Sequence, residues 1–168
     1  MIDVTTNPTR LYERLYVSVQ DLGMARQYAE MLLKKGWHSA PWERRGSVYM
    51  QQSAFTTALV VCYGRPFTNS KGWPSFPTAL LKLTASQAEL HFKLLNLRHQ
   101  VYAHSDSCRY EIELLHNSVG GEFDIVGAPF RKLEKGECQG IVEVTTKAMK
   151  NARTEMRRLR PSVSKAME

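Results

Sequence analysis

The chain has 168 residues, of which 43% are hydrophobic and 23% are charged, and its formal net charge is +7 at pH 7. These values are typical of a soluble globular protein, and the length predicts one domain with a hydrophobic core. No apolar run is long enough to span a membrane and no signal-peptide pattern opens the chain, so we expect a cytoplasmic protein without a membrane partner. The three cysteines are widely spaced, which argues against a disulfide framework and a zinc site and favours a reducing compartment.

The basic charge leaves two interpretations open. The isoelectric point is about 9.5, and lysine and arginine gain affinity for polyanions by releasing counterions from phosphates. A soluble protein with a basic surface and no nucleic-acid partner has the same composition. Charge alone does not separate these two interpretations.

The first predicted helix covers residues 8–35. Asn7 is a suitable N-cap, Pro8 occupies the first helical position, and Gly36 ends the pattern. Apolar residues at steps of three and four predict one buried face. That face consists of Leu11, Leu15, Val19, Leu22, Ala25, Ala29 and Leu32.

A second helix is predicted at residues 47–63, "SVYMQQSAFTTALVVCY". Its β-branched run also suits a buried strand, but the length of the segment and the lack of alternation favour a helix. Glycines and prolines make residues 64–77 a loop, and a short helix is expected at 78–83.

The third predicted helix begins after Thr84, where "TASQ" has the form of a capping box with Gln87. Its C-terminal part is the stretch "LRHQVYAHSD", residues 97–106. The expected apolar stripe is Ala88, Phe92, Leu95 and Tyr102.

A change of pattern follows this helix. Alternation in "CRYEIELLH", a turn-rich segment and a second apolar run predict a small β-hairpin within residues 109–130. A last helix is expected at 136–160, ended by Pro161 and followed by a loose tail at 161–168. Its predicted inward face is Ile141, Val144, Thr145, Ala148, Ala152 and Met156.

These elements predict one domain over residues 1–168. The fold class is mainly all-α: a bundle of about four long helices, with a helical core at 8–106 and the hairpin inserted before the last helix.

The stretch "LRHQVYAHSD" holds residues that suit RNA cleavage. A histidine can transfer a proton near neutral pH, and an arginine fork suits phosphate oxygens, so Arg98 and His104 meet the minimum for attack by a 2'-hydroxyl on its own phosphate. On a continuous helix, however, His104 would lie about 240° around from Arg98. The two converge only if the helix ends or distorts, or if a second chain completes the site. The alternative is structural, because cations favour helix C-termini.

The same stretch resembles the signature of the HEPN superfamily. In that pattern an arginine is followed directly by a polar residue and, four to six residues after the arginine, by a histidine; here these are Arg98, His99 and His104. A histidine seven residues before the arginine, His91, and the ending "AHSD" match one subset of the family. Upstream, "YGRPF" at residues 63–67 resembles the end of the second helix of the same subset.

The resemblance, which covers residues 47–106, implies an α-helical bundle that forms a homodimer. It further implies a metal-independent endoribonuclease without a cofactor, whose substrate is RNA and whose setting is toxin–antitoxin, abortive infection or another defence system, with an antitoxin as a possible protein partner. Relatives without activity imply the alternative: a non-catalytic HEPN-like module that binds a partner protein, RNA or a nucleotide through the same cleft.

The resemblance assigns roles to individual residues. Arg98 is expected to clamp the phosphate and His104 to transfer the proton. The expected supporting residues are His99, Asp106, His91 and Arg65. Each has a structural alternative: an ion pair for Arg98, a helix cap for His104 or Asp106, a solvated surface position for His99, a hydrogen bond for His91 and a turn for Arg65.

Two further groups of residues suit RNA. Tryptophans can stack on bases, although burial between helices is the commoner outcome; they are Trp37, Trp42 and Trp73. Basic residues crowd the end of the last helix, where a solvated face is equally compatible with the pattern; the candidates for RNA binding are Arg153, Arg157 and Arg158.

Overall fold

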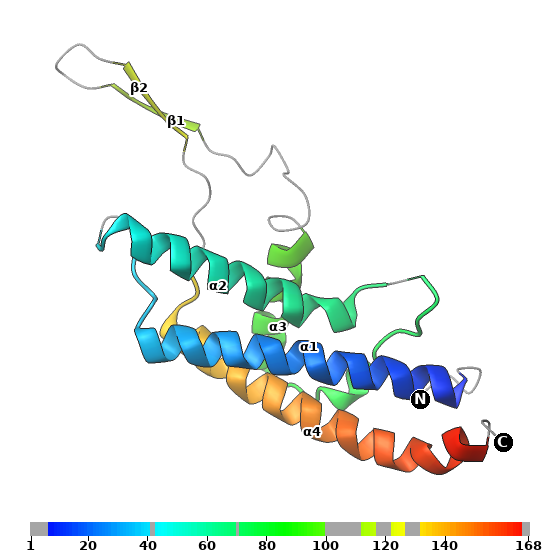
Figure 1. Ribbon diagram of the computed structural model, residues 1–168. Helices are drawn as coiled ribbons and strands as arrows, with labels where there is room; N and C mark the ends of the chain where they lie inside the picture. Colours follow the sequence, from blue (N-terminus) through cyan, green and yellow to red (C-terminus); the bar gives the residue numbers. More distant parts are fainter. Residues whose placement is uncertain are drawn as a thin grey trace.

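The computed structural model describes residues 7–40, 43–69, 71–99, 112–116, 122–126 and 132–165 (Figure 1). Within these ranges the chain is mainly helical, as predicted. The four helices are α1 (Pro8–Lys35), α2 (Gly46–Gly64), α3 (Ala85–Leu97) and α4 (Lys135–Lys165), and the two short 3-10 turns are η1 (Arg65–Phe67) and η2 (Thr78–Leu80).

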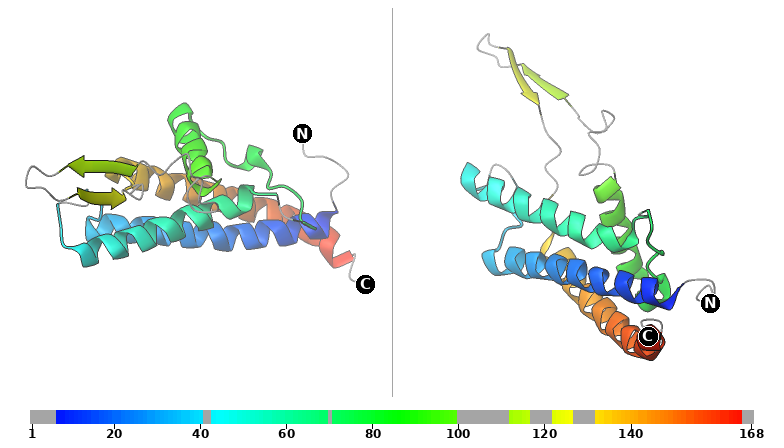
Figure 2. Two further views of the ribbon diagram at one scale, coloured as in Figure 1. Left: turned by 90° about the horizontal axis from the view of Figure 1, so that it is seen from above. Right: turned by 45° about the vertical axis from the view of Figure 1, so that its right-hand side comes forward.

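The helix α1 is the centre of the bundle. It packs along α2 on one side and along α4 on the other, running antiparallel to both (Figures 1 and 2). The shorter α3 crosses behind this layer and contacts α2 and α4. As a result the start of α1 and the end of α4 lie at the same end of the molecule.

Local signals account for the bounds of α1. The Asn7 side chain accepts a hydrogen bond of 2.9 Å from the Thr9 amide, and Gly36 ends the helix in the left-handed conformation, with φ at 61°. All seven apolar positions predicted for this helix are buried. Their three- and four-residue spacing produces a continuous stripe against α2 and α4.

The capping box predicted for α3 is confirmed, because Thr84 and Gln87 each accept a hydrogen bond from the other's backbone amide. The predicted apolar face of α3 is wrong. Phe92 is 63% exposed, whereas the buried residues of this helix are His91, Leu94 and Leu97. The face that meets α2 and α4 is therefore rotated by about one residue, which is about 100°, from the predicted stripe.

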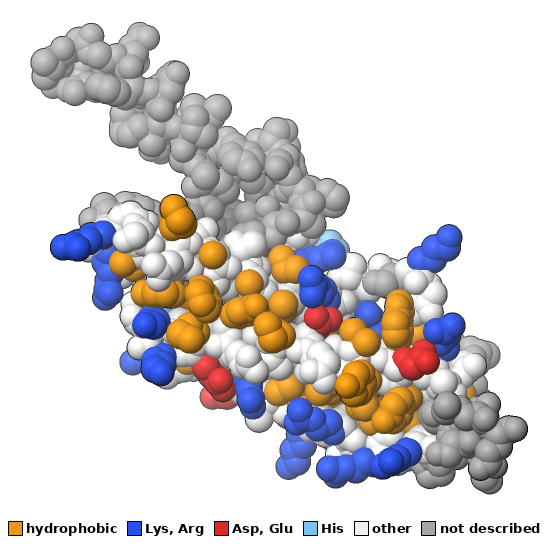
Figure 3. Space-filling model, in the orientation of Figure 1, with side chains coloured by type: hydrophobic (Ala, Val, Ile, Leu, Met, Phe, Trp, Pro, Cys, Tyr) orange, Lys and Arg blue, Asp and Glu red, His pale blue; other side chains and the backbone are white. Residues whose placement is uncertain are grey.

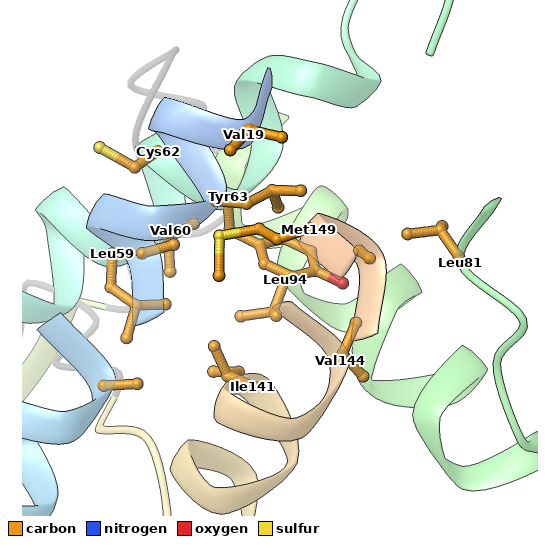
Figure 4. Packing of buried hydrophobic residues seen from close by; sticks show 14 of the residues in the cluster. Val19, Leu59, Val60, Cys62, Tyr63, Leu81, Leu94, Ile141, Val144 and Met149 are labelled. Carbon is orange, nitrogen blue, oxygen red and sulfur yellow. The ribbon is translucent and has the colours of Figure 1, made fainter. Parts of the chain in front are cut away.

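The core is continuous across the four helices. Tyr63 from α2 lies at its centre, near Leu94 of α3 and Val144 and Met149 of α4 (Figure 4). Burial on this scale, at roughly 25 cal/mol per Å² of apolar surface, is the main stabilising term of the fold. Tyr63 thus ties the end of α2 to both α3 and α4.

The helix α4 continues past Pro161 to Lys165, so the expected end at Pro161 and the loose tail from residue 161 are wrong. A proline removes one i to i−4 hydrogen bond, and neighbouring bonds can carry the helix across that gap. In the region of the expected hairpin, β1 (Ile112–His116) pairs antiparallel with β2 (Glu122–Val126). The segment that joins the two strands lies outside the described residues.

A buried arginine fastens the end of α2 to α1. Arg14 is 5% exposed, and its Nη2 donates to the carbonyl oxygens of Arg65, Pro66 and Thr68 at 3.2, 2.7 and 3.1 Å. These carbonyls belong to η1 and the residue that follows it, where no further helical turn supplies donors. Burial lowers the pKa of Arg14 below its usual value, and the nearby Asp21 opposes this effect.

Replacement of Arg14 by methionine should lower the free energy of unfolding by about 2–3 kcal/mol, because it leaves these carbonyls without a charged donor. The control is Arg10→Met, one turn earlier on α1, where the ion pair with Glu13 is exposed and contributes less than about 1 kcal/mol. Urea denaturation measures both. Equal losses in the two variants would contradict a structural role for the buried guanidinium.

Candidate functional site

Four of the predicted site residues lie on α3 or at the ends of α2 and α3. Arg98 follows the last residue of α3, His99 comes next, and Arg65 follows the last residue of α2. His91 lies two turns earlier on α3. The other two predicted site residues, His104 and Asp106, lie outside the described residues.

The stem of Arg98 lies directly on the backbone of Gly64. A Cβ placed on Gly64 would be 3.2 Å from Cβ of Arg98, which is tight, and 2.8 Å from its Cγ, which is closer than real Cβ atoms come to a neighbour. Only glycine permits this approach. The contact brings Arg98 of the predicted motif against the "YGRPF" segment, although the two are far apart in the sequence.

The regular helix ends before Arg98. Residues 98 and 99 form a π-helical turn, and the amide of Arg98 is shared between the carbonyls of Leu94 and Leu95. The regular α-helix thus ends at Leu97, and the position of His104 relative to Arg98 lies outside the described residues. Single π-helical turns occur frequently at functional sites.

His99 presents an exposed imidazole beside Arg98. Its Nδ1 lies 3.4 Å from Nη1 of Arg98, a weak contact at the limit of hydrogen bonding. A guanidinium can only donate, so this contact requires an unprotonated Nδ1 and puts the proton of neutral His99 on Nε2. A planar cation and an imidazole side by side suit a phosphate diester, since one binds oxygens and the other exchanges a proton.

Arg65 lies at the surface of the same junction. It is more than half exposed, and its Nη1 lies 3.3 Å from a carboxylate oxygen of Asp21 on α1. The neighbouring thiol of Cys62 is buried, and burial raises its pKa, which disfavours the nucleophilic thiolate. Arg65 thus adds an exposed guanidinium at the end of α2, partly neutralised by Asp21.

His91 is a buried hydrogen-bonding residue rather than an exposed acid or base. Its Nδ1 lies 2.9 Å from the hydroxyl of Tyr63, and the rings of Tyr63, Phe67 and Phe92 surround it. Burial lowers the pKa of His91, so the neutral ring is favoured, and burial raises the pKa of Tyr63 well above its usual value. His91 therefore stabilises the junction through its buried contacts with Tyr63 and Phe67.

A larger groove runs between the first turns of α3 and α4. Its volume is about 680 Å³, and its lining includes the carboxylates of Glu89, Glu137 and Glu143. The amine of Lys93, which also lines the groove, is paired with Glu137. The excess of carboxylates disfavours a phosphate-bearing ligand there, so size alone does not make this groove the site.

The other predicted RNA contacts are divided by the structure. Trp37 is buried and packs edge-on against Phe55, Trp73 is exposed, and Trp42 lies outside the described residues. Arg153 and Arg157 line a small pocket with Tyr12 of α1. Arg158 lies outside that pocket and is bound by Glu155.

Sequence reasoning missed two residues that build the junction, Arg14 and Gly64. Arg14 falls within the buried face of α1, where an arginine at a core position is an anomaly that signals a buried polar contact. The pattern of glycines and prolines places Gly64 only in a loop. The sequence marks Gly64 only through the match to "YGRPF". Its contact with Arg98, just after α3, cannot be deduced from local sequence.

In the described part of the chain, no three His, Cys, Asp or Glu side chains are grouped closely enough to hold a metal ion. The described helices include none that is long and apolar enough to cross a membrane. Comparisons with protein-family models, with curated proteins and with solved structures found no match to this chain.

Alanine at position 64 should displace Arg98 and lower the free energy of unfolding by about 1–3 kcal/mol, the usual cost of overpacking. Gly46→Ala, at the other end of α2, is the control: its Cβ would meet nothing within 4 Å, so stability should be unchanged or raised by up to about 1 kcal/mol. Chemical denaturation in an Arg98→Ala background provides the decisive comparison. If Gly64→Ala lowers stability as much in the Arg98→Ala background as in the wild type, the new methyl group does not clash with Arg98.

The buried His91 should make the protein less stable in mild acid. The folded state has the lower pKa, so the unfolded state binds more protons as pH falls below about 6.5, and stability present above that pH is lost toward the lowered folded-state pKa. One proton gives a slope of at most about 1.4 kcal/mol per pH unit. His91→Gln should lose this slope between pH 6.5 and 5, with its stability at pH 8 as the reference. An identical pH dependence in both proteins would refute the assignment.

Proposed function

We propose that this chain is a metal-independent endoribonuclease of the HEPN type, acting in the cytoplasm as a toxin or phage-defence effector. The observation that carries the proposal is the junction of α2 and α3, where Gly64 seats Arg98 beside an exposed His99. Arg98 binds the scissile phosphate and His104 transfers the proton. His99, Asp106, His91 and Arg65 support them.

The proposed reaction uses the RNA itself as the nucleophile. A neutral imidazole removes the proton from the 2'-hydroxyl, whose oxygen then attacks the adjacent phosphorus. The bond to the 5'-oxygen breaks, that oxygen takes up a proton from an imidazolium, and a 2',3'-cyclic phosphate remains. Arg98 offsets the charge that grows on the non-bridging oxygens. DNA lacks the 2'-hydroxyl and is not cleaved by this route.

A homodimer supplies both proton-transfer groups in this scheme. Two copies of His104 facing each other across a two-fold axis provide one base and one acid. The proposal is supported by apolar side chains left uncovered on the monomer, which gather over α1 and α2 on the face seen in Figure 3. The large exposed hydrophobic residues of these two helices are Tyr16, Val17, Met24 and Met50.

The test is RNA cleavage by purified protein in EDTA. The wild type should leave 2',3'-cyclic phosphate ends, and His104→Ala and Arg98→Ala should each lower the rate by at least about 100-fold, the usual contribution of a proton-transfer group or an oxyanion donor. Arg44→Ala is the control, because Arg44 is exposed at the opposite end of α2 from the junction.

Three outcomes would not support the ribonuclease. No turnover by a folded wild-type protein between about pH 6 and 8 would favour the alternative, a non-catalytic HEPN-like module that binds a partner protein, RNA or a nucleotide. Equal cleavage by wild type and His104→Ala would identify a contaminating nuclease. A marked fall in melting temperature in both site variants would instead indicate a structural role for the stretch.

A further inference from the structure

A second basic pocket lies at the end of the molecule where α1 begins and α4 approaches its end. Its volume is about 260 Å³. Its lining combines three arginines from one face of α4 with one aromatic and one thioether side chain. The lining residues are Tyr12, Arg153, Met156, Arg157 and Arg160.

The arginines of this pocket form a regular row. Positions 153, 157 and 160 are separated by four and three residues, so they share one helix face, and a rise of 1.5 Å per residue spreads them over about 10 Å. The row therefore presents several guanidinium groups along one line, which suits a backbone that carries a phosphate at every nucleotide. On the face seen in Figure 3, lysine and arginine side chains gather over this half of α4.

Two arginines of the row have charge available to a ligand. Among the described residues, no carboxylate is paired with Arg153 or Arg157. Arg158, on an adjacent face, differs: its Nε and Nη2 donate to both oxygens of Glu155 at 2.6–3.1 Å, and these bonds lower the pKa of Glu155. Within the described residues, Arg153 and Arg157 thus line the pocket without an ion-pair partner, whereas the neighbouring Arg158 is already bound.

The combination of a cationic row with Tyr12 and Met156 suits a single-stranded nucleic acid better than an acidic peptide. Each nucleotide carries both a phosphate for a guanidinium and a planar base for an aromatic or apolar surface. A run of aspartate or glutamate residues would pair with the arginines but would have no planar group to pack against Tyr12 and Met156.

We propose that this pocket is a subsite for single-stranded RNA, separate from the Arg98 junction. The choice of RNA rests on the proposed ribonuclease function. The pocket holds the strand by its phosphates through Arg153 and Arg157, and Tyr12 stacks against a base. It binds without sequence preference, since neither a guanidinium on a phosphate nor a stacked ring reads a base edge.

The test is the affinity of the full chain for a short 2'-O-methyl RNA, which the proposed reaction cannot cleave, measured by fluorescence anisotropy in EDTA over a series of salt concentrations. The double variant Arg153→Ala/Arg157→Ala should bind at least about tenfold more weakly. Its salt slope should be shallower by about 1.4, because each of the two phosphates that it no longer neutralises accounts for about 0.7 of the slope. Tyr12→Leu should weaken binding by about fivefold or more without changing the slope. Arg158→Ala is the matched control and should stay within twofold of the wild type.

The outcomes separate this proposal from the proposed activity. If the double variant binds as the wild type does, or its affinity falls no more than that of Arg158→Ala, the subsite is refuted even where the wild type cleaves RNA. If a polyglutamate peptide competes as well as the RNA and Tyr12→Leu has no effect, the RNA assignment is refuted. If binding depends on the row and no RNA is ever cleaved, the subsite stands and the ribonuclease fails. Circular dichroism and melting temperature must match between variants, which is expected because both arginines are exposed.

Discussion

The buried guanidinium of Arg14 is the contact on which the α2–α3 junction depends. It supplies donors to three carbonyls just after α2 and so fixes η1 against α1. The position of η1 in turn affects α3, because Phe67 of η1 packs against His91 of α3 at a centroid distance of 4.8 Å. Arg98, two turns further along the chain, then lies over Gly64. Because an unpaired buried carbonyl costs about 1–3 kcal/mol, this turn cannot shift without a fall in stability.

Features decided within one or two helical turns could be predicted from the sequence. The caps of α1, the capping box at Thr84 and the buried stripe of α1 depend on neighbouring residues, and all are present. The face of α3 could not be predicted in the same way. A histidine in an apolar pattern suggests an outward-facing position, yet His91 is buried because Tyr63, from another helix, meets its ring nitrogen. Phe92 is left exposed by the same rotation.

The sequence pointed to several residues of the α2–α3 junction but not to how they pack together. Arg98, His91 and the "YGRPF" segment all follow from the sequence pattern, and the structure brings them to one junction. The role of Gly64 depends on how closely α3 approaches α2, which is a property of packing and leaves no local trace. The π-helical turn at residues 98 and 99 is likewise invisible to a regular helical count.

Three arginines of this chain differ in what their guanidinium groups contact. Arg14 is buried, and its Nη2 donates to three carbonyls while its Nε has no partner among the described residues, so its contribution is to stability. Arg158 is exposed but bound by Glu155, and surface pairs of this kind contribute little. In Arg98 the stem is held by Gly64 while the head group stays at the surface. A side chain whose stem is already ordered loses less conformational entropy when its head group meets an anion, and a planar fork loses less still. Packing of the stem therefore sets Arg98 apart from the other surface arginines described, and it is the reason for proposing Arg98 as the phosphate-binding group.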